Sequence, residues 1–159
     1  MRTLLITLIV LLQFNLHGCA GEPPVTAETF RKGVPESERE SFEVSHTLYG
    51  VAGTFKRKTA ECLNTTITSQ SGTQKVVTRW NPSFTATPDN AELQLRRAQN
   101  ASEQGQLIMV VDITPTSPKK TRIDIYKSGV PDVILRTIRK WALGKDIGGC
   151  PDMMETIAP

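Results

Sequence analysis

The middle of the chain holds five strand-like runs, and the segments that connect them are short. Apolar residues recur at every second position within the runs, as at Ile123 and Ile125, so one side of each strand is apolar. The connections, including residues 82–90 and 115–120, are rich in turn-forming residues and too short for the crossover helices that parallel pairing requires. An antiparallel sheet is therefore predicted, with strands at Thr65–Gln70, Lys75–Trp80, Ala91–Arg97, Gln106–Thr114 and Thr121–Tyr126.

Two helical patterns flank these runs. A short strand around Phe42 and Val44 precedes apolar residues that recur every three or four positions from Leu48 to Cys62. The last pattern begins at Pro131, which suits a first helical position, and stops at Gly144, which suits the position after a helix end. The order predicts an α+β fold in which an antiparallel sheet of about five to six strands packs against two helices. This two-layer order resembles helix-grip folds, which occur in bacterial lipoproteins, including accessory lipoproteins of outer-membrane barrel assembly.

The first residues have the pattern of an export signal. Arg2 supplies a positive charge, and the apolar run of residues 4–12 is too short to span a bilayer. The run ends in Leu16-His17-Gly18-Cys19, which resembles the bacterial lipobox: an aliphatic residue three positions before a cysteine and a small residue directly before it. Residues 1–18 are thus expected to be a signal peptide. An ordinary secretory signal and an uncleaved anchor are the alternatives.

The lipobox resemblance implies that Cys19 becomes the first residue of a lipoprotein. In that family the thiol carries diacylglycerol and the amino group carries an acyl chain such as palmitate. At about 0.8 kcal/mol per buried CH₂, several chains make a lasting membrane anchor. Ala20 and Gly21 follow the cysteine, where the family places aspartate for inner-membrane retention. The resemblance implies an outer-membrane lipoprotein that faces the periplasm.

The segment after the cysteine is rich in Pro and Glu and shows no sustained apolar period. Such a stretch buries too little surface to offset its ordering entropy. Residues 19–40 are therefore expected to be the lipidated N-terminus and a flexible tether, with a helical turn at Thr26–Lys32 as the alternative. Residues 41–159 are expected to form a single domain.

Cys62 and Cys150 are the cysteines that remain beside Cys19. Disulfides persist in an oxidising envelope, and each of the two cysteines follows one predicted helix. We expect them to pair. In the chain-entropy model, closing a loop of this length stabilises the fold by roughly 4 kcal/mol.

The sequence predicts neither a catalytic residue nor a cofactor or metal ion. His46 is the only histidine after the signal segment and has no partners at ligand spacing. Asp112 and Asp124 lie on neighbouring predicted strands, where they either form a pair of acid–base carboxylates or sit on the solvent face. We favour the solvent face, on which Arg79, Arg96 and Arg97 are candidate partners, because strand alternation places polar residues there.

Charge gives little indication of a partner. The formal net charge of +3 falls to +2 without Arg2, and nucleic-acid binding is not expected. The basic runs Lys56-Arg57-Lys58 and Lys119-Lys120 suit either an anionic membrane surface or solvent. Trp141 lies in the apolar stripe of the last helix and is expected in the core.

Taken together, an anchor, a tether and a small domain without a reaction centre indicate a non-enzymatic module of the cell envelope that binds another envelope protein. The alternative is a carrier of lipid or another hydrophobic ligand, because a sheet curled around a helix can enclose an apolar cavity. A hydrolase of envelope polymers is a third possibility, which requires a cleft with converging polar groups.

Overall fold

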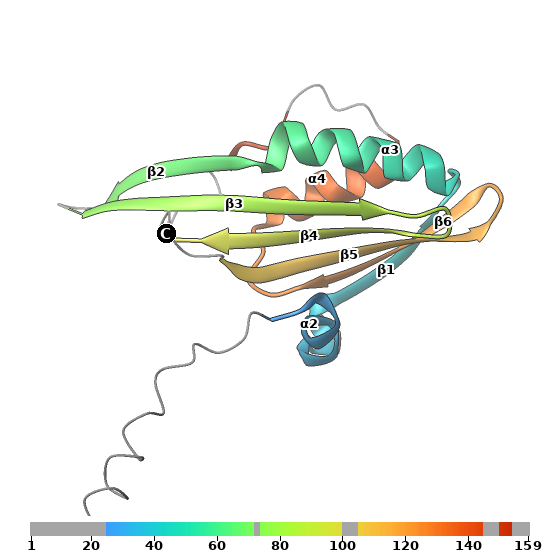
Figure 1. Cartoon of the computed structure of the whole chain (residues 1–159), viewed down its shortest axis with the longest axis horizontal. Coiled ribbons are helices and arrows are strands. Elements are labelled where there is room, and N and C mark those ends of the chain that lie inside the picture. Colours follow the sequence, from blue (N-terminus) through green and yellow to red (C-terminus); the bar gives the residue numbers. More distant parts are fainter. Residues whose placement is uncertain (1–24, 72–73, 100–104, 145–149, 154–159) are drawn as a thin grey trace, which may run out of the picture.

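The computed structural model describes residues 25–71, 74–99, 105–144 and 150–153, so the predicted signal peptide and Cys19 lie outside the described residues. One antiparallel sheet forms the centre of the molecule, with the strand order β1-β6-β5-β4-β3-β2 (Figure 1). The strands are β1 (Arg39–Val44), β2 (Thr65–Ser71), β3 (Gln74–Ala86), β4 (Ala91–Ala98), β5 (Gln106–Ser117) and β6 (Lys120–Lys127). The predicted α+β fold is thereby confirmed.

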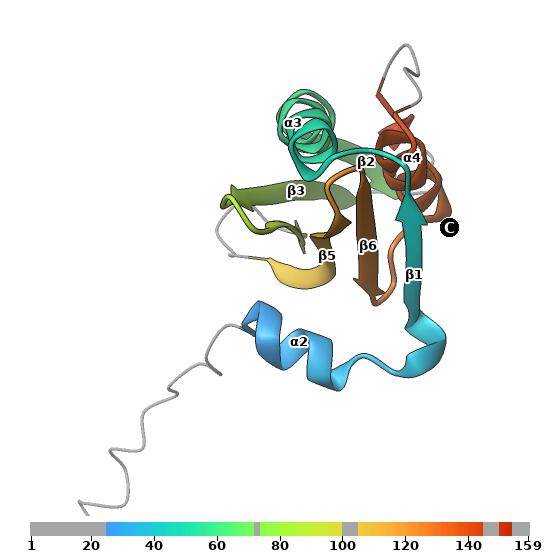
Figure 2. The ribbon, with the colours of Figure 1, turned by 90° about the vertical axis from the view of Figure 1, so that its right-hand side faces the viewer.

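Helices lie on both faces of the sheet. α3 (Leu48–Lys58) and α4 (Asp132–Ala142) cover one face, and the short α2 (Ala27–Gly33) lies on the other (Figure 2). A 3-10 turn at Glu36–Glu38 links α2 to β1, and a π-helical turn at Thr59–Leu63 links α3 to β2. β1 forms one edge of the sheet, where it pairs with β6: Arg39 lies opposite Tyr126 and Val44 opposite Thr121.

The main core lies between the sheet and the layer of α3 and α4. Strand alternation builds it: in β4 the side chains of Ala91, Leu93 and Leu95 are buried beneath the helices, while Glu92 and Gln94 point to the opposite face. The helices contribute large side chains at matching positions, and the rings of Phe55 in α3 and Trp141 in α4 meet edge to face with centroids 6.0 Å apart. Trp141 is therefore a core residue, as expected.

α2 corrects the predicted tether. Residues 27–40 form a helix, a turn and the first residues of β1, whereas a flexible tether was expected there. The reason is a second apolar cluster, in which Phe30 and Val34, one helical turn apart, pack on Leu107 and Val110 of β5. The Thr26 side chain accepts a hydrogen bond from the Thr29 backbone N–H and caps the helix. Residues 19–24 lie outside the described part of the chain.

Two prolines that were predicted to begin turns lie within strands instead. Pro82 belongs to β3, which continues to Ala86, and Pro115 belongs to β5, where it lies beside a register shift. Pro cannot donate a ladder hydrogen bond, so strands tolerate it at bulges and where one side is unpaired. Pairing of β2 with β3 stops at Trp80, just before Pro82, and both proline positions satisfy this rule.

Candidate functional site

An apolar groove of about 390 Å³ lies between α3 and the end of β3. Leu48, Ala52 and Gly53 form its helical wall, and Phe84 and Pro88 belong to the opposite wall. Charged residues contribute only Lys56 among the nine that line it. A groove of this composition suits apolar side chains of a partner.

Tyr49 lines this groove and is a large aromatic residue that is almost fully exposed. Its side chain is 90% exposed, far more than any other large hydrophobic residue of the described chain. It lies in the first turn of α3, whose N-terminus is capped by the side-chain oxygen of Thr47. Tyrosine is enriched in protein interfaces because its ring provides contact area at a low entropic cost.

The local sequence explains why the groove is open. The ladder between β2 and β3 ends at the Thr65–Trp80 pair, so residues 81–86 have a partner strand only on the β4 side. Gly53 adds space, because a Cβ at this position would meet nothing within 4 Å. The groove thus forms because β3 continues beyond the end of its pairing with β2 and because Gly53 of α3 has no side chain.

The opposite face of the sheet carries a row of three carboxylates. Glu92, Asp112 and Asp124 occupy directly opposed positions on β4, β5 and β6. Asp112 and Asp124 therefore lie next to each other on the face away from the main core, as strand alternation predicted, but α2 covers part of this face and both side chains are half-buried rather than solvent-exposed. Each of them binds an arginine, with Arg122 Nε 2.9 Å from Asp124 Oδ1.

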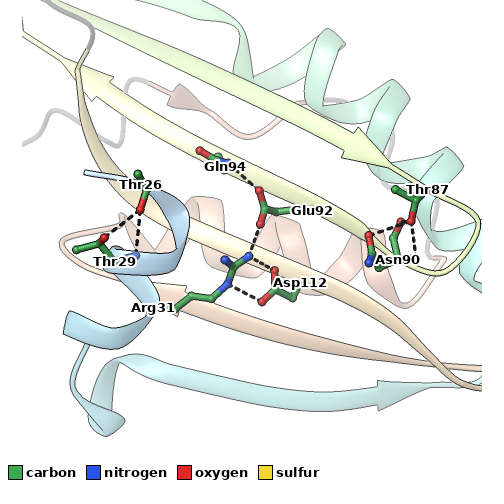
Figure 3. A network of polar contacts seen from close by, with 8 residues as sticks. All are labelled: Thr26, Thr29, Arg31, Thr87, Asn90, Glu92, Gln94 and Asp112. Carbon is green, nitrogen blue, oxygen red and sulfur yellow. Dashed lines mark hydrogen bonds and ion pairs between the residues drawn. The ribbon is translucent and has the colours of Figure 1, made fainter. Parts of the chain in front are cut away.

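Arg31 of α2 binds the other two carboxylates of this row (Figure 3). Its Nε lies 2.8 Å from Asp112 Oδ2 and its Nη2 2.5 Å from Asp112 Oδ1, and Nη2 also donates to Glu92. The hydrogen bond to Asp112 is the main reason why the pKa of the Arg31 guanidinium is raised above its ordinary value. This arrangement fastens α2 to the sheet, and the arginine occupies oxygens that an acid–base pair would need.

Two of the three arginines that were candidate partners of these carboxylates, Arg96 and Arg97, donate to backbone carbonyls instead. Arg96 donates to the carbonyl oxygens of Val25 and Gly105, and Arg97 to that of Gly129. Arg79 lies opposite Thr66 in the sheet. The expected pairing of Arg96 and Arg97 with Asp112 and Asp124 is therefore not what the structure contains.

A second, more polar depression of about 550 Å³ borders a different face of α3, at Gly50, Val51 and Thr54, and also includes His46, Lys119 and Trp141. His46 Nε2 is 3.3 Å from the carbonyl oxygen of Leu143, and this ring contacts Gly144. Gly144 has a positive φ of 65°, and a Cβ there would approach His46 Nε2 to 3.1 Å. Gly144 thus ends α4, as predicted, because its φ is positive and a side chain there would crowd His46. His46 lies within hydrogen-bond distance of a carbonyl oxygen at this helix end.

Cys62 and Cys150 are joined by a disulfide in the structure, with their Cα atoms 5.0 Å apart. The bond holds the segment Cys150–Met153 beside the π-helical turn and the start of β2. Met153 packs against the main core from this segment. No group of three His, Cys, Asp or Glu residues suited to a metal ion occurs in the described ranges.

The two basic runs serve different roles. Lys58 lies 3.6 Å from Glu61 with its side chain 15% exposed, whereas Lys56 reaches the apolar groove. Lys120 binds Glu43 of β1 at 2.9 Å. Lys119 lines the His46 depression, which shares no lining residue with the groove that Lys56 reaches.

Comparison with known proteins adds no function to these observations. No family model, curated protein or solved structure matches this chain. Any functional assignment must therefore come from the geometry. Within the part of the chain that the structure describes, no helix is both long and apolar enough to cross a membrane.

Sequence reasoning missed the groove and the role of Arg31. Tyr49 and Ala52 were assigned to a helix, but the missing neighbour of β3 depends on where the β2 ladder ends, which local patterns do not encode. Arg31 had a weak signal, since it follows Phe30 on a segment in which Phe30 and Val34 are spaced by four. Its partners lie 61 and 81 residues away.

Proposed function

We propose that the chain is a membrane-anchored lipoprotein of the cell envelope that binds another envelope protein through the groove between α3 and β3. The observation that carries this proposal is the 90% exposed Tyr49 beside an apolar, open groove. Burial of a large exposed aromatic side chain by a partner lowers the free energy of the system and so favours binding.

The position of the anchor supports the same surface. If Cys19 is lipidated, the six residues to Val25 span at most about 21 Å, so the domain stays close to the bilayer. The chain enters the described domain at α2, on the face of the sheet opposite to α3 and α4 (Figure 2). The groove beside α3 then faces away from the membrane, where a second protein has access to it.

Packing of the main core gives the carrier alternative no support. That alternative needs a ligand cavity beneath the C-terminal helix, but Ile134, Ile138 and Trp141 of α4 are at most 1% exposed and belong to one continuous cluster with the sheet. Both grooves that border α3 open to the surface, and the one that includes Tyr49 has the more apolar lining.

Photocrosslinking in intact cells tests the proposal. A photoreactive phenylalanine analogue at Tyr49 should give a reproducible adduct with one envelope protein, whereas the same analogue at Leu143, an exposed apolar residue away from the groove, should not. Absence of an adduct at Tyr49, or equal adducts at both positions, would contradict the proposal.

A groove-filling variant sharpens the experiment. Gly53→Leu places a side chain at the groove, where its Cβ meets nothing within 4 Å, and should raise stability by about 1 kcal/mol because Gly is unfavourable in a helix. The Tyr49 adduct should then disappear although the protein is at least as stable. Gly33→Leu is the matched control, since a Cβ there also meets nothing within 4 Å but lies in α2.

A further inference from the structure

The two edge strands of the sheet differ in how they are protected from pairing. β1 has the sequence RESFEV, and its Glu40 and Glu43 bind Arg139 and Lys120. β2 has the sequence TTITSQS, without a charged residue, proline or glycine. Charges and prolines are the usual devices that prevent an edge strand from pairing with another chain. β2 lacks them, and its composition favours strand pairing.

β2 also belongs to an incomplete part of the sheet. The pairing of β3 with β4 begins at Arg79, so among the described strands residues 74–78 of β3 have only β2 as a neighbour. The β2–β3 hairpin therefore extends beyond the ends of the other strands, which Figure 1 shows clearly. A two-stranded hairpin is only marginally stable in water, and a third strand would stabilise it.

A depression of about 500 Å³ runs beside the start of β2. One wall is formed by Thr65–Thr68, and the other by Cys150–Met153, the segment that the disulfide holds in place. A strand that is added to β2 would direct every second side chain into this depression, next to Ile67 and Met153. Both are apolar, so the added strand should carry apolar residues on this side.

The charge of the depression favours a segment of another protein over a second copy of this chain as the added strand. The depression includes the carboxylate of Glu61, which is half exposed although Lys58 lies 3.6 Å away. β2 of a second copy would bring no cation to it, because β2 contains none. A segment with one Lys or Arg beside its apolar residues complements the depression in both respects.

We propose that the outer edge of β2, which pairs with no other strand of the described residues, binds an extended segment of another protein as an additional strand, with alternate apolar side chains and one basic residue facing the depression beside Cys150–Met153. The backbone of the segment pairs with β2, and its side chains provide the selectivity. These residues are separate from the groove at Tyr49, so either proposal can fail without the other.

Hydrogen exchange of the full-length protein in detergent micelles tests this pairing with a defined probe. The probe is an acetylated and amidated heptapeptide of alternating valine and threonine with one terminal lysine, made with the lysine at either end. At a concentration of about ten times the measured Kd, amides of Thr65–Ser71 should exchange about tenfold more slowly for one of the two peptides. Unchanged exchange in β2 with both peptides overturns the proposal.

N-methylation distinguishes strand pairing from side-chain binding. In an extended peptide the valine and threonine amides face opposite edges, so methylation of one set should weaken binding by about tenfold or more, while methylation of the other set is tolerated. Equal effects of both sets overturn the proposal. Protection of β2 that grows with protein concentration in the absence of peptide also overturns it, because a second copy would then be the occupant.

The charge requirement has its own variants. Glu61→Gln should abolish the preference for the lysine peptide over an uncharged version, whereas Glu43→Gln on the β1 edge should leave the preference unchanged. A preference that persists in the Glu61→Gln variant overturns the assigned basic residue.

Discussion

Arg31 links α2 to the sheet through ion pairs with Glu92 and Asp112. It is the cation between two half-buried carboxylates, and it brings α2 to a face of the sheet that would otherwise carry like charges side by side. Without it, Glu92 and Asp112 repel each other at opposed positions of β4 and β5. The ordering of the first described helix thus depends on charge as much as on its apolar cluster.

Arg31→Ala should therefore lower the free energy of unfolding by about 1–2 kcal/mol, because charge-assisted hydrogen bonds are lost and two carboxylates remain. Urea denaturation measures the change. Lys32→Ala is the control: Lys32 pairs with Glu28 on the exposed side of α2, with both side chains about three-quarters exposed, and should cost at most about 0.5 kcal/mol. Equal losses in both variants would show that the Arg31 contacts do not stabilise α2.

Glu40 provides a pH-dependent link between β1 and α4. The hydrogen bonds from Arg139 are the main reason why the pKa of Glu40 is lowered from its ordinary value of 4.5. A carboxylate with a lowered folded-state pKa stabilises the protein fully above about pH 4.5, and this contribution disappears as the pH falls through the folded pKa.

Glu40→Gln should accordingly lower stability at pH 7 and have progressively less effect below about pH 4.5. Thermal denaturation between pH 7 and pH 3 follows the difference between the two proteins. A difference that is constant down to pH 3 would mean that the Arg139 contact does not control this carboxyl group.

The elements could largely be predicted from the sequence, and the exceptions have physical causes. Apolar alternation located the strands and the stripe of α4, because burial on one face imposes period two in a strand and 3.6 in a helix. The tether was wrong because α2 contributes only a short apolar pattern, whose partners Leu107 and Val110 lie far along the chain. The groove escaped prediction because it depends on where two ladders end.

The disulfide is the feature that joins distant elements, and it yields a prediction about stability. It connects residues 88 positions apart, the turn after α3 and the segment before Met153. Replacing Cys62 and Cys150 together by Ser should lower stability by roughly 2–5 kcal/mol, mostly by relaxing a constraint on the unfolded chain, without a change of fold.

Circular dichroism and denaturation of the double variant measure these effects, and non-reducing peptide mapping of protein from the cell envelope tests the pairing itself. Two free thiols that react with an alkylating reagent in the native protein would contradict the disulfide. The same result would remove the support for the wall of the depression beside β2.

For the whole molecule, the proposed lipid anchor at Cys19 yields a prediction of its own. Cys19→Ala should release the protein from membranes or leave it as an uncleaved precursor, because acylation and cleavage both use that thiol. Membrane fractionation with intact-mass analysis decides between these states. A mature wild-type protein that begins at a residue other than Cys19, or lacks the mass of acyl chains, would contradict the lipoprotein proposal.

The pairing of β1 with β6 has a consequence for how the chain folds as it emerges from its N-terminus. These strands are the first and the last of the sheet along the sequence, and Val44 must find Thr121 before the sheet is complete. Synthesis therefore delivers β1 long before its partner, and contacts so distant in sequence slow folding. Until β6 arrives, β1 and the apolar faces of the emerging strands are exposed, which makes the incomplete chain prone to aggregation and a substrate for chaperones.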